Sequence, residues 1–166
     1  MKLTVSIPDE VFESAESLGK RLGVSRSRLY TTALAEGFED WASVDHFGVT
    51  VAGPAWRDGL IPDTTVHGWT KSDDRWRRRL ALVSTVRLNT PARGGNGDAT
   101  RTLKVCRRLI ADRDDMIVKA MSWALRELAK RNPAAVKRFL KEEGEHLAAR
   151  ARREVRNKLE TGLKNP

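Results

Sequence analysis

The sequence predicts a mainly α-helical protein, in which stacked helical pairs form a solenoid behind a short strand-helix-helix segment. Three observations support this fold class. Apolar residues recur at helical spacing through most of the chain after residue 70, and the loops between these stretches are short. Clean alternation of apolar and polar residues marks a strand at residues 2–7. A length of 166 residues suits one domain, or one domain with a small appendage.

The N-terminal segment is predicted to contain this strand and two helices. Pro8 ends the strand and suits the first turn of a helix, and Gly23 ends that helix as a C-terminal cap. Ser25 caps a second helix, which extends to about Phe38. A lone strand leaves its backbone groups unpaired, so it needs a partner. We therefore expect a homodimer in which two chains pair through this strand.

This pattern resembles the ribbon-helix-helix family of DNA-binding proteins, in which two chains pair their strands antiparallel. The resemblance covers residues 2–37 and defines a first segment, 1–37. It implies that the outward side chains of the strand contact bases in the major groove. It also implies that the start of the second helix binds phosphate through free backbone amides. The residues implicated are Lys2, Thr4, Ser6, Ser25, Arg26 and Ser27.

The remainder of the chain, residues 38–166, is predicted to be helical after a turn-rich stretch. Residues 48–70 contain glycines and prolines that break up short helices. Ser72 is the expected cap of the next helix, and Asn132 with Pro133 is a typical helix start. Helices are expected at about 73–88, 99–111, 114–131, 133–143 and 145–161. No repeat is visible in the letters, as is common for HEAT-like units.

Positive charge is concentrated after the N-terminal segment. Residues 1–40 hold 5 Lys and Arg against 7 Asp and Glu, whereas residues 41–166 hold 26 against 15. This imbalance favours a polyanionic partner, above all nucleic acid, through counterion release. The alternative is a well-solvated helical surface, because charge alone carries no specificity.

Composition also limits the other function classes. Cys106 is the only cysteine, which excludes an internal disulfide and fits a reducing cytoplasm. The three histidines are scattered, so we expect no metal site, and no cofactor is predicted. The N-terminus lacks the pattern of a secretion signal, and no stretch approaches the roughly 18 apolar residues of a membrane span. We therefore expect a cytoplasmic protein without a membrane partner.

Trp123 stands out because it lies in a basic stripe of its predicted helix. At about 100° per residue, one face of this helix carries Lys119, Trp123, Arg126 and Lys130. The apolar residues of the helix lie around the other side. An indole between phosphate-binding cations is suited to stacking on a nucleobase. Alternatively, Trp123 packs on a neighbouring helix pair, with the cations extending around it.

Arg79 presents the opposite anomaly, because it falls within the apolar arc of its helix. A buried guanidinium must find a carboxylate or a phosphate, since burying it unpaired costs several kcal/mol. Asp45 and a DNA phosphate are the candidate partners, and a purely structural ion pair is the alternative. Arg77 and Arg78 lie outside the arc, where they face solvent or phosphate.

Trp41 and Asp45 lie one helical turn apart, so both can face one cleft. A carboxylate beside an indole can stabilise an oxocarbenium-like centre or orient a water molecule. The alternative is that Asp45 serves as a helix cap or a surface charge.

Three ordered runs of residues, together with the spacing between them, resemble the AlkD-like family of DNA alkylation repair proteins, which are all-helical HEAT-like DNA glycosylases. The resemblance covers about residues 38–160 and rests on Trp41-x3-Asp45, Trp69-Thr-Lys-Ser72-Asp-Asp-Arg-Trp76-x2-Arg79-x-Ala81 and Lys119-Ala-x2-Trp123-Ala-Leu-Arg126-Glu127-x-Ala-Lys-x-Asn132-Pro133. It implies excision of cationic alkylated purines, such as 3-methyladenine and 7-methylguanine, from duplex DNA by hydrolysis of the N-glycosidic bond.

The resemblance also implies roles by position. Trp41 and Trp123 would be the aromatic walls of the site, Asp45 the catalytic carboxylate, and Arg79 a phosphate clamp near the lesion. This family is thought to act with the lesion still stacked, which suits an open groove lined by indoles. Its members place further helical repeats before the segment that holds Trp41, so part of the groove should be absent here. Further DNA contacts are expected from Lys71, Arg77, Arg78, Lys119, Arg126 and Lys130.

The leading expectation is therefore a DNA alkylation repair glycosylase, a hydrolase that needs no cofactor and whose partner is duplex DNA carrying alkylated bases. One alternative is a dimeric ribbon-helix-helix regulator or antitoxin-like protein whose helical domain is non-catalytic. Another is a scaffold whose helices bind a second protein.

Overall fold

A computed structural model describes residues 38–166, apart from the side chain of Arg93. The predicted strand-helix-helix segment lies outside these residues, and with it Lys2, Thr4, Ser6, Ser25, Arg26 and Ser27. From residue 38 onward the described chain is mainly helical and contains no strand. No helix in this part of the chain has the length and the hydrophobicity needed to cross a membrane.

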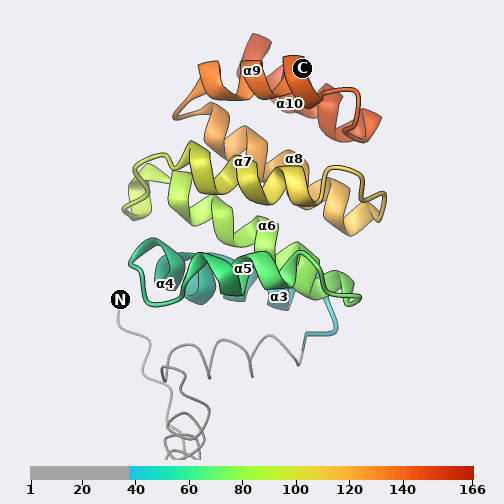
Figure 1. Cartoon of the computed structure of the whole chain (residues 1–166). Coiled ribbons are helices and arrows are strands. Elements are labelled where there is room, and N and C mark those ends of the chain that lie inside the picture. The colour runs from blue at the N-terminus through green and yellow to red at the C-terminus, as the bar shows by residue number, and fades with distance from the viewer. Residues whose placement is uncertain (1–37) are drawn as a thin grey trace, which may run out of the picture.

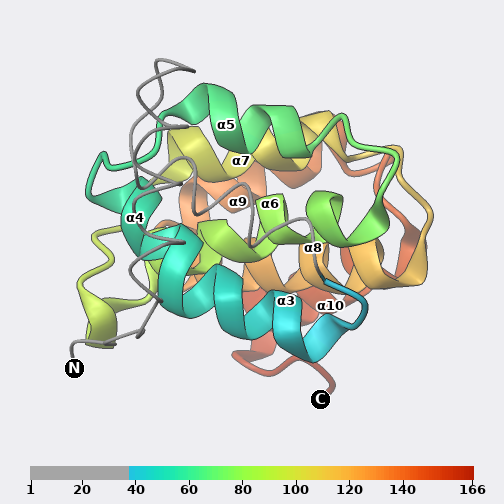
Figure 2. The ribbon, with the colours of Figure 1, turned by 90° about the horizontal axis from the view of Figure 1, so that it is seen from below.

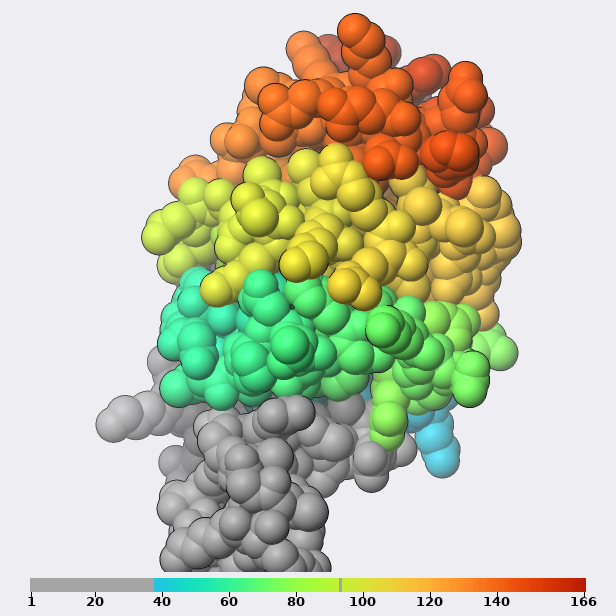
Figure 3. Space-filling view, in the orientation of Figure 1, coloured from blue at the N-terminus to red at the C-terminus, as the bar shows by residue number. Residues whose placement is uncertain are grey.

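Helical elements fill most of the described chain. The first three follow without a break: α3 (Trp41–Phe47), a π-helical segment (Gly48–Ala52) and α4 (Gly53–Arg57). The other elements are α5 (Asp63–Trp69), α6 (Arg75–Asn89), a 3-10 turn (Pro91–Arg93), α7 (Ala99–Arg108), α8 (Asp115–Ala129), α9 (Pro133–Glu143) and α10 (Ala149–Thr161). They follow one another along a stack that begins at α3 to α5 and ends at α9 and α10 (Figure 1; Figure 3).

The helices form two layers, which we call inner and outer. The inner layer contains α3, α4, α6, α8 and α10, with the most extensive packing between α6 and α8 and between α8 and α10. The outer layer contains α5, α7 and α9, each packed on its neighbours in the inner layer. Figure 2 shows this division from below, with α5 and α7 along one side and α3 and α10 along the other. Such stacked helical pairs agree with the predicted α-helical solenoid.

α6 lies at the centre of the stack, because every side chain from Arg79 to Asn89 is buried. Gly53 lets α4 pack closely on it, since a Cβ at this position would lie 2.7 Å from the carbonyl oxygen of Ser84. The buried amide of Asn89 donates to the hydroxyl of Thr102 in α7 at 2.9 Å. α6 is thereby packed closely on α4 and hydrogen-bonded to α7.

The predicted helix starts are partly confirmed. Asn132 caps α9 as predicted, because its side chain accepts from the amide of Ala135 at 2.9 Å. The predicted cap at Ser72 is wrong. Asp74 caps α6 instead, accepting from the amide of Trp76 at 2.9 Å, and Ser72 accepts from the amide of Asp74 at 3.2 Å. A carboxylate is the stronger acceptor, which explains why it occupies the capping position.

Candidate functional site

The inner layer carries an open groove of about 500 Å³, which we call the inner groove. It lies where α3, the start of α6, α8 and α10 meet, and the chain beyond α10 also reaches it. All four residues predicted for the centre of the site line this groove. Its lining consists of Trp41, Asp45, Arg79, Met116, Lys119, Trp123, Arg126, Arg150 and Lys164.

α3 presents Trp41 and Asp45 to the groove. The Asp40 side chain caps this helix, accepting from the amide of Ala42 at 2.7 Å. Val44 is fully buried and anchors α3 on the core. Trp41 and Asp45, one turn apart, both line the groove, and Trp41 is 55% exposed. An indole with more than half of its surface in solvent contributes little to the core and is available to stack on a ligand.

Asp45 and Arg79 form a two-pronged ion pair. Arg79 Nε donates to Asp45 Oδ1 at 2.8 Å, and Arg79 Nη2 donates to Asp45 Oδ2 at 2.7 Å. The third nitrogen, Nη1, donates to the backbone carbonyl of Met116 at the start of α8. Arg79 is only 5% exposed, so its position in an apolar arc is explained by these partners. Asp45 is thus one of the two candidate partners named from the sequence, and contact with a DNA phosphate stays a prediction.

The Asp45 carboxylate remains partly accessible from the groove. Its side chain is 17% exposed, against 6% for that of Arg79. A carboxylate offers about four acceptor positions, and the guanidinium occupies two of them. Asp45 is therefore fixed in orientation and still able to accept a hydrogen bond from a water molecule or to face a positive centre.

Trp123 joins the core to the groove. It is half-buried and packs against the hydrophobic core, while it also lines the inner groove. Its neighbours Ala124 and Leu125 are fully buried, which fixes the face of α8 that carries it. The alternative of packing on neighbouring helices is thus present in the structure, while stacking on a nucleobase stays a prediction.

The cations of α8 are each held by a neighbour on the same helix. Lys119 pairs with Asp115 at 2.6 Å, and Arg126 Nε donates to the hydroxyl of Ser122 at 3.1 Å. Burial lowers the pKa of Arg126 from its ordinary value, and this effect outweighs the opposing charge of Glu154. These side chains are thus oriented before any ligand arrives.

α10 contributes a group of residues that was not predicted. Glu154 is 3% exposed, and it accepts from Ser122 Oγ at 2.5 Å and from Arg150 Nε at 3.0 Å. Lys164 Nζ lies 3.5 Å from the same carboxylate. Burial raises the pKa of Glu154, but hydrogen bonds from Ser122 and Arg150 overcome this and hold it below its usual value. The spacing of Arg150 and Glu154, one turn apart in a predicted helix, could have indicated the pair.

We compared the whole chain with sequence models of known protein families. The sequence model of the DNA alkylation repair enzyme family matches residues 13–159. The chain belongs to this family. DNA alkylation repair is therefore its role and DNA its partner. A comparison with curated proteins finds no match.

Membership in the alkylation repair family confirms one of the two resemblances. The match begins at residue 13, inside the segment that resembles the ribbon-helix-helix family, and no finding supports that second resemblance. The corresponding residues lie outside the described part of the chain, so the strand and its base contacts stay predictions.

Four of the predicted DNA contacts in this family member do not line the inner groove. Arg78 is used structurally, because it donates to Asp112 at 2.8 Å and to the carbonyl of Ser72 at 2.9 Å. Lys130 pairs with Glu127 at 2.5 Å and is not among the residues that line the groove. The remaining two are Lys71, which is exposed before α6, and Arg77, which is half-buried.

No cluster of His, Cys, Asp or Glu side chains within residues 38–166 could hold a metal ion. Cys106 is buried, and burial raises the pKa of its thiol to about 12. A thiol with this pKa is protonated at neutral pH and is a poor nucleophile. The groove itself is lined by the Asp45 carboxylate, two indoles and several cations.

Proposed function

We propose that this DNA alkylation repair protein excises cationic alkylated purines, of the 3-methyladenine and 7-methylguanine type, by hydrolysing the N-glycosidic bond in duplex DNA. The observation that carries the proposal is the Asp45 carboxylate, held by the two prongs of Arg79 and open to a groove bordered by Trp41 and Trp123. This arrangement combines a fixed negative charge with two aromatic faces.

The reaction needs little more than that arrangement. The C1′–N bond breaks, and its electron pair goes to the base, which leaves as a neutral molecule because the alkylated purine was cationic. Positive charge develops on the sugar, where a fixed carboxylate stabilises it. A water molecule then bonds to C1′ and releases a proton. The free acceptor positions of Asp45 suit it to face the sugar and to orient this water.

The two indoles supply recognition of the leaving base. A cationic purine is attracted to the face of an aromatic ring, and stacking contributes about 1–3 kcal/mol per base. Trp41, being the more exposed of the two, has the larger free face. Trp123, which packs on the core, provides the fixed surface.

The cations around the groove are proposed to bind the phosphates that flank the lesion. Lys119 and Arg150 share Asp115, at 2.6 and 3.1 Å, and Arg150 also pairs with Glu154. Because their carboxylate partners hold them in place, less side-chain freedom is lost when a phosphate binds. Lys164 and Arg126 complete this set.

Arg79 is proposed to act by positioning Asp45. Its three guanidinium nitrogens all donate to protein acceptors, two of them to Asp45 and one to Met116. Its predicted role as a phosphate clamp would require a phosphate to share these donors, and it stays a prediction. We therefore assign Arg79 to the positioning of Asp45, because the observed ion pair supports that role.

The organisation of the whole chain also stays a prediction. We propose residues 38–166 as the alkylation repair domain and 1–37 as a separate segment, with a homodimer formed through the latter. Mass measurement in solution at micromolar concentration tests the homodimer, and a monomer would contradict it.

Release of free base from methylated duplex DNA tests the function. Wild-type protein should release 3-methyladenine and 7-methylguanine, and Asp45→Asn should release neither while it binds DNA with nearly the same affinity. Asp73→Asn is the matched control, because Asp73 is exposed and lies outside the inner groove. Normal release by Asp45→Asn would overturn the assigned role. DNA binding without release by the wild type would favour a non-catalytic helical domain.

A further inference from the structure

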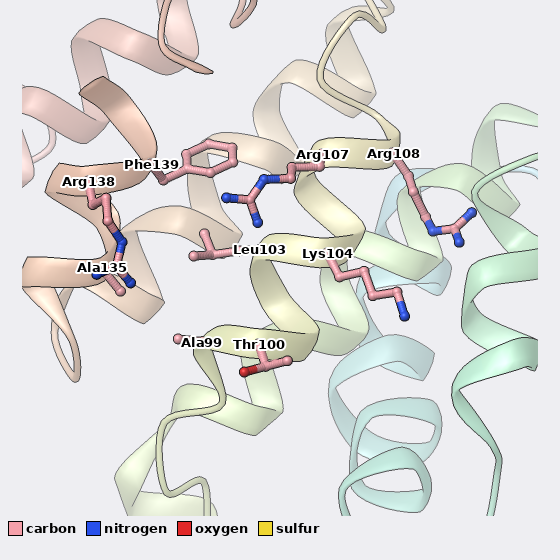
Figure 4. A pocket seen from close by; sticks show the side chains of 9 residues that line it. All are labelled: Ala99, Thr100, Leu103, Lys104, Arg107, Arg108, Ala135, Arg138 and Phe139. Carbon is pink, nitrogen blue, oxygen red and sulfur yellow. The ribbon is translucent and has the colours of Figure 1, made fainter. Parts of the chain in front are cut away.

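A second groove, of about 570 Å³, lies between α7 and α9 in the outer layer. We call it the outer groove, and Figure 4 shows the side chains around it. Four of its lining residues are cations, and none is a carboxylate. The lining consists of Ala99, Thr100, Leu103, Lys104, Arg107, Arg108, Ala135, Arg138 and Phe139.

One of the four cations is fixed by the protein. The Arg107 guanidinium carbon lies 5.4 Å from the centre of the Phe139 ring, and Arg107 pairs with Glu143 at 3.2 Å and with Glu142 at 3.5 Å. Figure 4 shows Arg107 extending from α7 toward Phe139, with Arg138 on α9 across the hollow. Arg107 thus presents a pre-oriented guanidinium at the middle of the groove.

The other three cations have no ion-pair partner within the described part of the chain: they are Lys104, Arg108 and Arg138. Lys104 and Arg108 lie one turn apart on α7, where like charges repel and destabilise a helix. Their field reaches the buried His67 of α5, whose pKa is lowered first by burial and then by the charges of Arg108 and Lys104. Three of the four positive charges of the outer groove are therefore left without a carboxylate partner in the described part of the chain.

We infer that the outer groove binds the phosphate backbone of a second DNA duplex. Guanidinium groups bind phosphate oxygens through paired hydrogen bonds, and a lysine adds a mobile point charge. Arg107 and Arg138 offer this chemistry between α7 and α9. Lys104 and Arg108 extend from α7 on the side away from Phe139 and enlarge the basic surface there (Figure 4). The two glutamates that pair with Arg107 do not belong to the lining, so positive charge predominates in the groove.

The duplex in the outer groove has to be a different one from the duplex in the inner groove. The two grooves belong to opposite layers, and each layer is about 10 Å thick, the diameter of a helix. DNA resists bending over roughly 150 base pairs, so one duplex cannot turn around so thin a stack. This inference rests on the proposed function only in that the inner groove binds the first duplex.

Energy transfer between two short duplexes, one labelled with a donor and one with an acceptor, tests the inference. Wild-type protein should bring the two labels together. The variant Lys104→Ala/Arg108→Ala/Arg138→Ala should need about tenfold more protein or fail to do so, because three phosphate contacts are lost. The matched control is Arg131→Ala/Lys137→Ala/Lys141→Ala, which removes three exposed cations outside the groove lining and should keep most of the transfer.

The outcomes of these experiments distinguish a failure of the inference about the outer groove from a failure of the proposed base excision. Base release by the triple variant of the outer groove should equal that of the wild type, because the inner groove is unchanged. Single-duplex binding without energy transfer in the wild type would overturn the inference and leave the proposed function intact. Energy transfer that survives in the triple variant, or that falls equally in the matched control, would also overturn it. If the wild-type protein bound no duplex at all, both proposals would be contradicted.

Discussion

The inner and outer grooves are both basic, but their cations are held in different ways. In the inner groove, Arg79, Lys119 and Arg150 each pair with a carboxylate. In the outer groove, among residues 38–166, only Arg107 does so. The first arrangement fixes side chains for a particular geometry, whereas the second keeps net charge available to any polyanion. The comparison indicates that precise positioning belongs to the inner layer and general attraction to the outer one.

The largest effect is expected from Arg79→Ala, because it removes the guanidinium that holds Asp45. The free energy of unfolding should fall by about 3 kcal/mol, the low end for buried pairs since Asp45 keeps some solvent contact. Base release should fall by about 100-fold or more, because the carboxylate loses its orientation. Chemical denaturation and single-turnover base release measure the two effects.

Arg78→Ala is the matched control for Arg79→Ala. It removes the same charge one position earlier and breaks the pair of Arg78 with Asp112, at 2.8 Å. This pair is partly exposed and lies outside the inner groove, so stability should fall by about 1 kcal/mol and base release should persist. Equal losses of excision in the two variants would mean that Arg79 acts only through stability.

The next largest effect is expected from replacing either indole, and the two replacements should differ in their effect on stability. Trp41→Ala should slow base release by about 10- to 100-fold through lost stacking, with little change in melting temperature, since the side chain is 55% exposed. Trp123→Ala should lower both the rate and the melting temperature, because Trp123 also packs on the core. A large loss of stability in Trp41→Ala would show that its role is structural.

A smaller effect is expected from Glu154→Gln, which keeps the shape of the side chain and removes the charge that holds Arg150 and Lys164. DNA affinity should fall several-fold, with KM rising more than kcat falls. The pKa of Glu154 is held below its ordinary value of 4.5, so its charge stabilises the fold above that pH. The stabilisation is lost as the pH falls through the lower folded pKa.

Thermal melting across pH checks this assignment of Glu154. The wild type should be more stable than Glu154→Gln at pH 7, and the difference should shrink as the pH falls below 4.5. Glu160→Gln is the control, because Glu160 is an exposed residue of the same helix. A difference between wild type and Glu154→Gln that does not change with pH would contradict the role of its charge.

Salt should produce the smallest but most direct contrast between the grooves. Binding in the outer groove rests on charge alone, whereas binding in the inner groove also includes stacking on indoles. Energy transfer between two duplexes should therefore be lost at a lower salt concentration than base release. If both signals fell together in a titration from 50 to 200 mM salt, the grooves would not differ in this way; the range is one over which phosphate-dominated binding typically drops by about 10³-fold or more.

The sequence predicts the helices better than it predicts the spaces between them. The start of α9 follows from Asn132 and Pro133, whose capping preferences act within one turn. The sequence predicts Ser72 as the cap of α6, but the structure places the cap two residues later, at Asp74, whose carboxylate is the stronger acceptor. Local preferences thus locate helices to within a few residues.

The candidate site likewise contains one contact that the sequence indicates and another that it does not. The pairing of Arg79 with Asp45 was among the predicted alternatives, because a guanidinium in an apolar arc demands a partner. Glu154 was missed because its importance arises from Ser122 of α8, which is far away in the sequence. The outer groove depends on how α7 and α9 stack, and helical periodicity contains no information on that contact.

Arg79 also links three successive parts of the stack: it belongs to α6, binds α3 through Asp45 and binds the start of α8 through the Met116 carbonyl. The curvature of the solenoid between α3 and α8 therefore depends on the hydrogen bonds that this one side chain makes. Any bending that separates these helices must stretch or break a hydrogen bond to Arg79, and it would move Trp41 relative to Trp123. The separation of the two indoles in the proposed site therefore depends on the hydrogen bonds that Arg79 makes to α3 and α8.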